Sequence, residues 1–174
     1  MTRLMISLFA LSCIAAPALA EDGPEGLFVT IDDKTEAPRG IVELSRTADG
    51  ELVGTIRGAL VDEPDSSPNC DDCEGELQGH PIIGLPFLYG LEPKDEEGRE
   101  WKSGRIIDPE SGETYKAKAE FEEGFDAIKV RGYIGTPILG RNQYWRRATP
   151  ADIDAANAIA TARDLPRIET PTDP

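Results

Sequence analysis

Cys70 and Cys73 form the most distinctive chemical motif of the sequence, a Cys-x-x-Cys pair in an acidic stretch. Such a pair exchanges disulfides when a helix N-terminus or a nearby cation lowers the thiol pKa. Here Asp71 and Asp72 separate the cysteines, and their negative charges disfavour a thiolate. A metal clip of both sulfurs, His80 and one aspartate is a second alternative. We predict a structural Cys70–Cys73 disulfide and no bound metal or cofactor.

His80 is the one histidine of the chain, so any histidine-based catalytic site would depend on it. Its neighbours Gly79 and Pro81 are typical of a loop. The carboxylates are too numerous to single out a catalytic pair, and no nucleophile is visibly matched to a base. We therefore predict no catalytic residues and keep an enzyme as the weakest functional alternative.

The aromatic and basic side chains of the second half of the chain are the best candidates for ligand contact. Trp101, Arg105 and their alternate neighbours would share one face of a strand. If that face points inward, Arg105 places a charge beside apolar walls, which would orient the anionic head of a ligand. If it points outward, Arg105 pairs with surface carboxylates. The candidate ligand-binding residues are Trp101, Arg105, Tyr115, Arg131, Tyr133 and Trp145.

Short alternating segments separated by turns must position these residues. Tyr115, Ala117 and Ala119 alternate with charged residues, the period of a half-buried strand. Turn signals such as Asp49-Gly50 separate the segments. The glycines at 54 and 58 indicate a bend or bulge in a strand whose even-numbered residues would share one face. We predict eight strands, at about residues 26–32, 41–44, 52–60, 87–91, 100–108, 113–122, 125–134 and 143–147.

Three further segments complete the expected organisation. Residues 61–79 lack an apolar period and make a long loop, which the two cysteines would hold in place. Thr149 is a suitable N-cap and Pro150 a suitable first residue for a helix over 149–163. Ile153, Ala156 and Ile159 give that helix a thin apolar stripe that would dock on the strands. The proline-rich residues 164–174 read as a disordered tail.

The first twenty residues read as a cleaved secretory signal peptide. Arg3 precedes an apolar run, and Ala18-Leu19-Ala20 offers a small-x-small cleavage site. Residues 21–148 would then form one domain, exported to the periplasm or the medium. An oxidising compartment agrees with the predicted disulfide. The formal net charge of −15 argues against nucleic acid and anionic membrane surfaces as partners.

Several motifs together resemble a family of exported bacterial proteins known only as domain of unknown function 2147. The resemblance covers residues 26–147 and is carried by Gly26-Leu27-Phe28, Cys70-x-x-Cys73, the segment from Trp101 to Tyr115, the segment from Val130 to Arg141, and Trp145. It implies a lipocalin-like β-barrel and no established activity. Many members have Trp where this chain has Phe28. Because a late arginine packs across that ring in lipocalins, the resemblance places Arg146 or Arg147 over Phe28.

The fold class predicted is therefore all-β, an antiparallel lipocalin-like barrel of about eight strands with a C-terminal helix. Eight strands enclose enough space for packed side chains or for one small ligand. We predict that the barrel binds a small, partly apolar molecule. The alternative is a filled barrel that acts as a structural or protein-interaction module of the cell envelope. The sequence specifies neither the ligand nor whether the chain is a monomer or a dimer.

Overall fold

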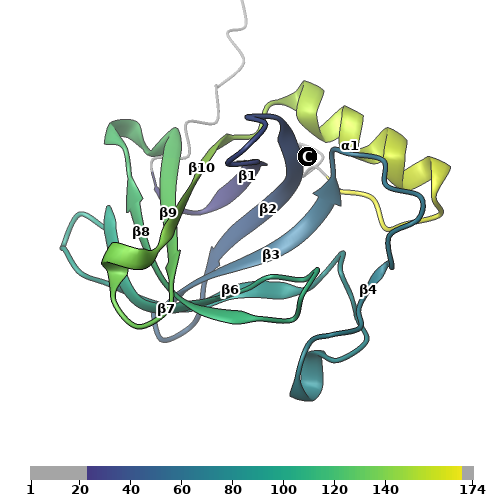
Figure 1. Ribbon diagram of the computed structural model, residues 1–174. Helices are drawn as coiled ribbons and strands as arrows, with labels where there is room; N and C mark the ends of the chain where they lie inside the picture. Colours follow the sequence, from purple (N-terminus) through teal and green to yellow (C-terminus); the bar gives the residue numbers. More distant parts are fainter. Residues whose placement is uncertain (1–22, 170–174) are drawn as a thin grey trace, which may run out of the picture.

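The computed structural model describes residues 23–169, in which eight antiparallel strands close into a barrel and one helix lies outside it (Figure 1). The strand order around the barrel is β1-β10-β9-β8-β7-β6-β3-β2. The strands are β1 (Gly26–Ile31), β2 (Pro38–Arg46), β3 (Leu52–Ala59), β6 (Pro86–Pro93), β7 (Glu100–Ile107), β8 (Thr114–Phe121), β9 (Ala127–Tyr133) and β10 (Arg141–Arg147). The predicted fold class is confirmed, and the predicted signal peptide lies outside the described residues.

The barrel is closed because β1 pairs with both β2 and β10. Phe28 faces Val42 on one side and Arg147 on the other. Within residues 23–169, closure leaves the barrel sheet itself without an open edge for pairing with another chain. The interior of the barrel holds a large buried apolar cluster that includes Phe28, Trp101, Phe121 and Trp145.

β3 contributes side chains both to the core inside the barrel and to the packing outside it, because a bulge changes the face on which its later residues lie. Gly54 approaches Leu88 and Leu44 inside the barrel, whereas Gly58 lies against Ala156 and Ile168 outside it. The register with β2 shifts by one residue between these glycines. The predicted bulge is therefore present, but the even-numbered residues of the strand do not share one face. A bulge inserts one residue and reverses which face the following side chains occupy.

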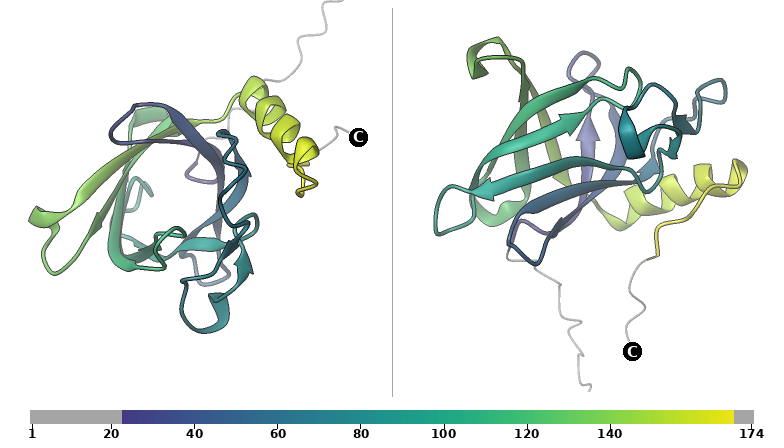
Figure 2. Two further views of the ribbon diagram at one scale, coloured as in Figure 1. Left: turned by 45° about the vertical axis from the view of Figure 1, so that its right-hand side comes forward. Right: turned by 90° about the horizontal axis from the view of Figure 1, so that it is seen from below.

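The helix α1 (Pro150–Ala162) packs against β2 and β3 on the outside of the barrel (Figure 2). Thr149 caps it in a reciprocal capping box with Asp152. Ala156 and Ala160 are buried on its inner face, and Ile153 is partly buried beside them. A second, smaller core beneath the helix joins Ala156 to Val29, Ile41 and Ile168.

The predicted disordered tail does not begin at Asp164. Ile168 is buried in the core beneath α1. The side-chain amide of Asn157 accepts a hydrogen bond from the Ile168 backbone N–H at 2.8 Å and donates one to its carbonyl at 3.1 Å. These two bonds fix the backbone after the helix and direct Ile168 inward. Residues 170–174 of the predicted tail lie outside the described residues.

The long loop after β3 is held against the barrel by its own small ribbon and disulfide. β4 (Asn69–Cys70) pairs with β5 (His80–Pro81), and the 3₁₀ turn η1 (Gly75–Leu77) lies between them. Cys70 and Cys73 are bonded to each other, as predicted, and both are buried in the large cluster. Two further 3₁₀ turns, η2 (Glu123–Phe125) and η3 (Pro137–Leu139), connect the last three strands. In the described part of the chain, α1 and the 3₁₀ turns are all too short or too polar to cross a membrane.

Candidate functional site

One end of the barrel is sealed by aromatic rings that are covered by arginines. The Arg147 guanidinium lies 4.4 Å from the centre of the Phe28 ring, and that of Arg46 lies 4.9 Å from the Trp101 ring. The Trp101 indole N–H donates to the Gly98 carbonyl at 2.8 Å, so this buried polar atom is satisfied. Arg147 also donates to the backbone carbonyls of Gly23 and Glu25, which lead into β1. This end leaves little room for a ligand.

The opposite end of the barrel opens into a hollow of about 1180 Å³, which continues over the rim to Gly58, Arg163 and Leu165 beside α1. Its apolar walls come from the inner faces of the strands: Val42, Ile56, Phe87, Ile106 and Val130. Loops that follow β1, β3, β7 and β9 surround its mouth. Binding sites for small molecules combine such apolar walls with a few polar groups. The barrel is therefore packed with side chains toward the sealed end and hollow toward the opposite end.

Gly132 gives the cavity part of its width. A Cβ added at this position would meet Ile106 Cγ2 at 3.4 Å and the Cβ of Tyr115 at 3.8 Å, which are ordinary contacts. The φ of Gly132 is not positive, so a larger residue fits its backbone conformation. A bulky side chain at this position would therefore occupy space that a ligand would use.

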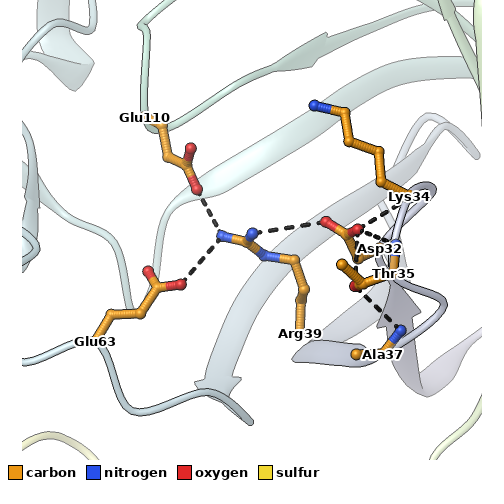
Figure 3. Close-up of polar contacts among 7 residues, drawn as sticks. All are labelled: Asp32, Lys34, Thr35, Ala37, Arg39, Glu63 and Glu110. Atoms are coloured by element: carbon orange, nitrogen blue, oxygen red, sulfur yellow. Dashed lines mark hydrogen bonds and ion pairs between the residues drawn. The ribbon is translucent and has the colours of Figure 1, made fainter.

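Three loops of the mouth meet at one arginine, Arg39 (Figure 3). Its guanidinium donates to Glu110 at 2.6 Å and lies 3.7 Å from both Glu63 and Asp32. Asp32 also accepts from the backbone N–H groups of Thr35 and Lys34, which lowers its pKa, with a smaller contribution from Arg39. Because all these groups are accessible to water, the pairs position the loops more than they stabilise the fold.

The mouth as a whole is acidic. The carboxylates that line it are Asp32, Asp33, Glu63, Asp71, Asp72, Asp108 and Glu110. The cations that line it are Lys34, Arg39, Arg141 and Arg163. Arg39 is shared among three of the carboxylates, so its charge is neutralised locally. The field at the mouth therefore favours a neutral or cationic group over an anion.

Polar groups on the cavity wall cluster where β8, β9 and β10 meet the mouth. Tyr115, Tyr133, Arg141 and Gln143 all line the cavity. The Tyr115 hydroxyl donates to the Glu113 carboxylate, and this hydrogen bond raises the pKa of the phenol. Gln143 accepts from the buried Trp145 indole N–H at 3.2 Å. These side chains supply the donors and acceptors that would orient a ligand.

The family model described as an uncharacterized protein conserved in bacteria, DUF2147, matches residues 26–147. The chain belongs to this family. Among solved structures, a Helicobacter pylori protein described as belonging to the lipocalin family superposes with a TM-score of 0.60. The two chains are 16% identical, and the match covers 84% of this chain and 92% of the other. At that identity the likeness concerns the fold. No curated protein sequence matches.

The closed end of this DUF2147 protein carries the arginine contact that the resemblance predicted. Of the two candidates, Arg147 covers Phe28, while Arg146 instead forms a double hydrogen bond with Asp152 at the start of α1. The aromatic ring at the first strand and the arginine at the last strand therefore fasten the two strands that close the barrel.

Two of the six candidate ligand-binding residues of the DUF2147 chain line the cavity. Tyr115 and Tyr133 do so at its mouth. Trp145 is buried below, where its ring lies 5.9 Å from that of Phe87, which does line the cavity. Trp101 is buried at the sealed end. Neither tryptophan is among the lining residues, so both support the cavity from beneath.

Arg105 and Arg131 face the outside of the barrel. The register of β7 with β8 shifts between Trp101 and Gly104, where Ser103 has a φ of 65°. Gly104 is consequently buried and Arg105 exposed, so Trp101 and Arg105 do not share a face. Arg131 donates to the carbonyls of Pro137 and Ile138 and to the Asn142 side chain. It shapes the hairpin between β9 and β10.

Sequence reasoning missed Arg39, Arg141, Gln143 and Gly132. Arg39 belongs to an Ala-Pro-Arg-Gly segment that the sequence pattern predicts as a turn without chemical function, and in the structure it lies at the start of β2. Its partners come from loops far apart in the sequence, so only the closed barrel brings them together. Gln143 alternates with Trp145 on β10, and this period was the one available indication that it faces the interior.

His80 and the disulfide lie beside the cavity lining rather than in it. The His80 ring nitrogen Nδ1 is 2.7 Å from the Pro81 carbonyl oxygen. Because Cys70 and Cys73 are joined, neither sulfur is a thiolate that could ligate a metal. Within residues 23–169, no three cysteine, histidine or carboxylate side chains gather as a metal site.

Proposed function

We propose that this protein is an exported binding protein that holds a small, partly apolar molecule in the open half of its barrel. The observation that carries the proposal is the hollow of about 1180 Å³, which is lined by apolar side chains of the strands and by polar groups of the loops around its mouth. A barrel acting only as a structural module has no need of an open interior. The disulfide supports export, because such bonds persist in oxidising compartments.

The charge of the mouth indicates which molecules fit. Its carboxylates outnumber its cations, and Arg39 is already neutralised by three of them. An apolar body in the cavity would place its polar end among these carboxylates. We therefore propose a ligand with a neutral or cationic head, in place of the anionic head that an inward-facing Arg105 would orient. Tyr115, Tyr133 and Gln143 are the proposed polar contacts.

The test of the cavity is binding of the neutral apolar dye N-phenyl-1-naphthylamine, followed by its fluorescence. We expect Gly132→Phe to abolish dye binding, because the new ring fills the cavity without a backbone clash. Lys118→Phe is the matched control, because it adds the same ring to the exposed face of β8. Unchanged dye binding by Gly132→Phe, with a native unfolding midpoint, would refute the cavity as the binding site.

Competition with the dye tests the ligand class. Decylammonium and decanoate have similar apolar tails and opposite charges. We expect decylammonium to displace the dye at a concentration at least about tenfold lower than decanoate, since a difference of one favourable charge contact near a protein surface is worth ~1.4 kcal/mol. Equal competition, or stronger competition by decanoate, would contradict the neutral or cationic head and leave the cavity itself in place.

A further inference from the structure

The cations of this acidic chain are concentrated on one outer wall of the barrel. Half of the exposed positions of β7 and β8 are basic, and β9 adds the partly exposed Lys129 and Arg131. The register places Arg105 beside Lys116, and Lys118 beside Arg131. We call this wall the basic face; its cations are Lys102, Arg105, Lys116, Lys118, Lys129 and Arg131.

Three carboxylates share this wall: Glu92 lies opposite Lys102, and Glu100 lies opposite Glu120. On the basic face, Lys129 pairs with Glu120. Lys102, Arg105, Lys116 and Lys118 form no ion pair with any residue of the described range 23–169. The sequence has no Asp or Glu from Ala127 to Ala151, although it contains 33 in all. Lys102, Arg105 and Lys116 also surround a shallow outer hollow of about 380 Å³.

An exposed apolar tip adjoins the basic face. The hairpin between β9 and β10 projects beyond the barrel wall (Figure 2) and carries Ile134, Ile138 and Leu139. Ile138 is 86% exposed and Leu139 80% exposed, although apolar side chains of this size are usually covered. Adjacent apolar residues left open to water commonly mark a surface that contacts a partner.

The apolar tip is held in its exposed conformation by the basic face itself. Arg131 donates to the Pro137 carbonyl at 2.6 Å and to the Ile138 carbonyl at 3.3 Å. A Cβ on Gly140 would meet the Gly132 carbonyl oxygen at 2.5 Å and the Tyr133 Cβ at 2.8 Å, so this glycine permits the tip to fold back closely. The isoleucine and leucine side chains therefore project from a fixed turn and not from a free loop.

We propose that the basic face and the apolar tip together dock this protein on the surface of an anionic phospholipid bilayer. Cations next to protruding apolar side chains match a layer of negative headgroups above an apolar phase. Tyr144, which is 56% exposed and lies opposite Lys129 of β9, has the amphipathic ring that favours such an interface. An acidic protein is a poorer partner for this surface. It would attract the cations, but it would offer no apolar phase to Ile138 and Leu139.

The net charge of −15 does not oppose this docking at physiological salt. Charges are screened beyond a Debye length of about 8 Å, which is less than the width of an eight-stranded barrel. β2, β3 and α1 lie across the barrel from β8 and β9. The bilayer would therefore experience the local cations more strongly than the distant acidic loops. This proposal differs from the expectation, drawn from net charge alone, that argues against anionic membrane surfaces as partners.

The test is co-sedimentation with vesicles of phosphatidylglycerol and phosphatidylcholine in equal parts, compared with phosphatidylcholine alone. Protein beginning at Glu21 avoids binding through the apolar residues before it, and it retains the whole barrel and helix. We expect Lys116→Glu/Lys118→Glu to lower the partition coefficient by about tenfold or more, since each cation near an anionic surface contributes roughly fivefold. Arg57→Glu/Arg167→Glu is the matched control, with the same charge change on the opposite wall.

Ile138→Ser/Leu139→Ser separates a membrane from other anionic surfaces. We expect this variant to lose most vesicle binding while its unfolding midpoint stays native, because both side chains are exposed. Undiminished binding by this variant would overturn a bilayer as the partner. Equal binding of the wild type to vesicles with and without phosphatidylglycerol would also overturn the proposal. Equal losses of binding in Lys116→Glu/Lys118→Glu and Arg57→Glu/Arg167→Glu would overturn it as well. These measurements need no cavity ligand, so they are independent of the proposed function.

Discussion

The contact between Arg146 and Asp152 fastens α1 to the barrel, and we predict that Asp152→Asn weakens the fold. Asp152 accepts from Arg146 Nη1 at 2.7 Å and Nη2 at 2.8 Å, and from the Thr149 backbone N–H at 2.8 Å. Its side chain is only 14% exposed. The same carboxylate therefore caps the helix and joins it to the last strand.

The expected loss is about 2–3 kcal/mol of unfolding free energy. A hydrogen bond to a charged group contributes roughly 1.5–3 kcal/mol, and a helix cap ~1 kcal/mol. Asparagine keeps one acceptor oxygen, so part of the cap survives, but the charge that Arg146 pairs with is lost. Urea unfolding at neutral pH measures the difference. Asp154→Asn, at an exposed position of the same helix, should change stability by less than about 0.5 kcal/mol.

The pH dependence of this loss follows from the direction of the pKa shift. The hydrogen bonds from Arg146, more than any other contact, hold the pKa of Asp152 well below its ordinary value of 3.8. A depressed pKa contributes stability that is fully present above 3.8 and is lost as the pH falls toward the folded pKa. The difference in unfolding free energy between wild type and Asp152→Asn should therefore shrink by about 1 kcal/mol between pH 7 and pH 3. The reasoning would be refuted if this difference in unfolding free energy stayed constant from pH 7 to pH 3. It would also be refuted if Asp154→Asn showed the same pH-dependent difference from wild type.

Two further predictions concern packing and the disulfide. Gly104→Ala places a Cβ 2.5 Å from Leu91 Cδ2 inside the barrel, so urea unfolding should show a loss of about 1–3 kcal/mol. Gly132→Ala, where the nearest atom is 3.4 Å away, should cost less than half as much, and equal losses would contradict the packing account. Replacing Cys70 and Cys73 together by alanine should lower stability by about 2 kcal/mol, because the bond closes a short loop. Calorimetry of reduced and oxidised protein would check this figure, and identical melting profiles would contradict it.

The strands and the helix were predictable because their signals are local. Alternation over Tyr115 to Ala119 and turns such as Asp49-Gly50 place the strands near their observed positions. Thr149 and Pro150 begin the helix as expected. Each of these signals depends on residues within one turn or one strand, so no tertiary information is needed to read them.

Which side chains of a strand point into the barrel was less predictable, because a bulge reverses the alternation of inward and outward residues. Ser103 interrupts the alternation of β7, so Trp101 is interior and Arg105 is not. The ladder shift that accompanies such a bulge depends on the partner strand and leaves no reliable signal in one sequence. The mouth was equally inaccessible, since Arg39 and Glu110 meet only when the barrel closes. Burial of Ile168 depended on Asn157, a polar residue that gives no apolar pattern.

The bulge in β3 also determines which kinds of mutation the strand tolerates. Residues before it fill the barrel, and Gly58 after it supports α1. Replacing Arg57, an exposed residue, by another polar residue would leave both cores intact. Deleting Thr55, which is regularly paired with Glu43, would instead turn Ile56 out of the barrel and Gly58 away from α1, so the helix would lose its packing surface. Along this short stretch the number of residues should therefore be conserved more strictly than the type of the exposed residue. Single-residue insertions and deletions among relatives should accordingly be absent between Gly54 and Ile56 and permitted in the long loop that follows.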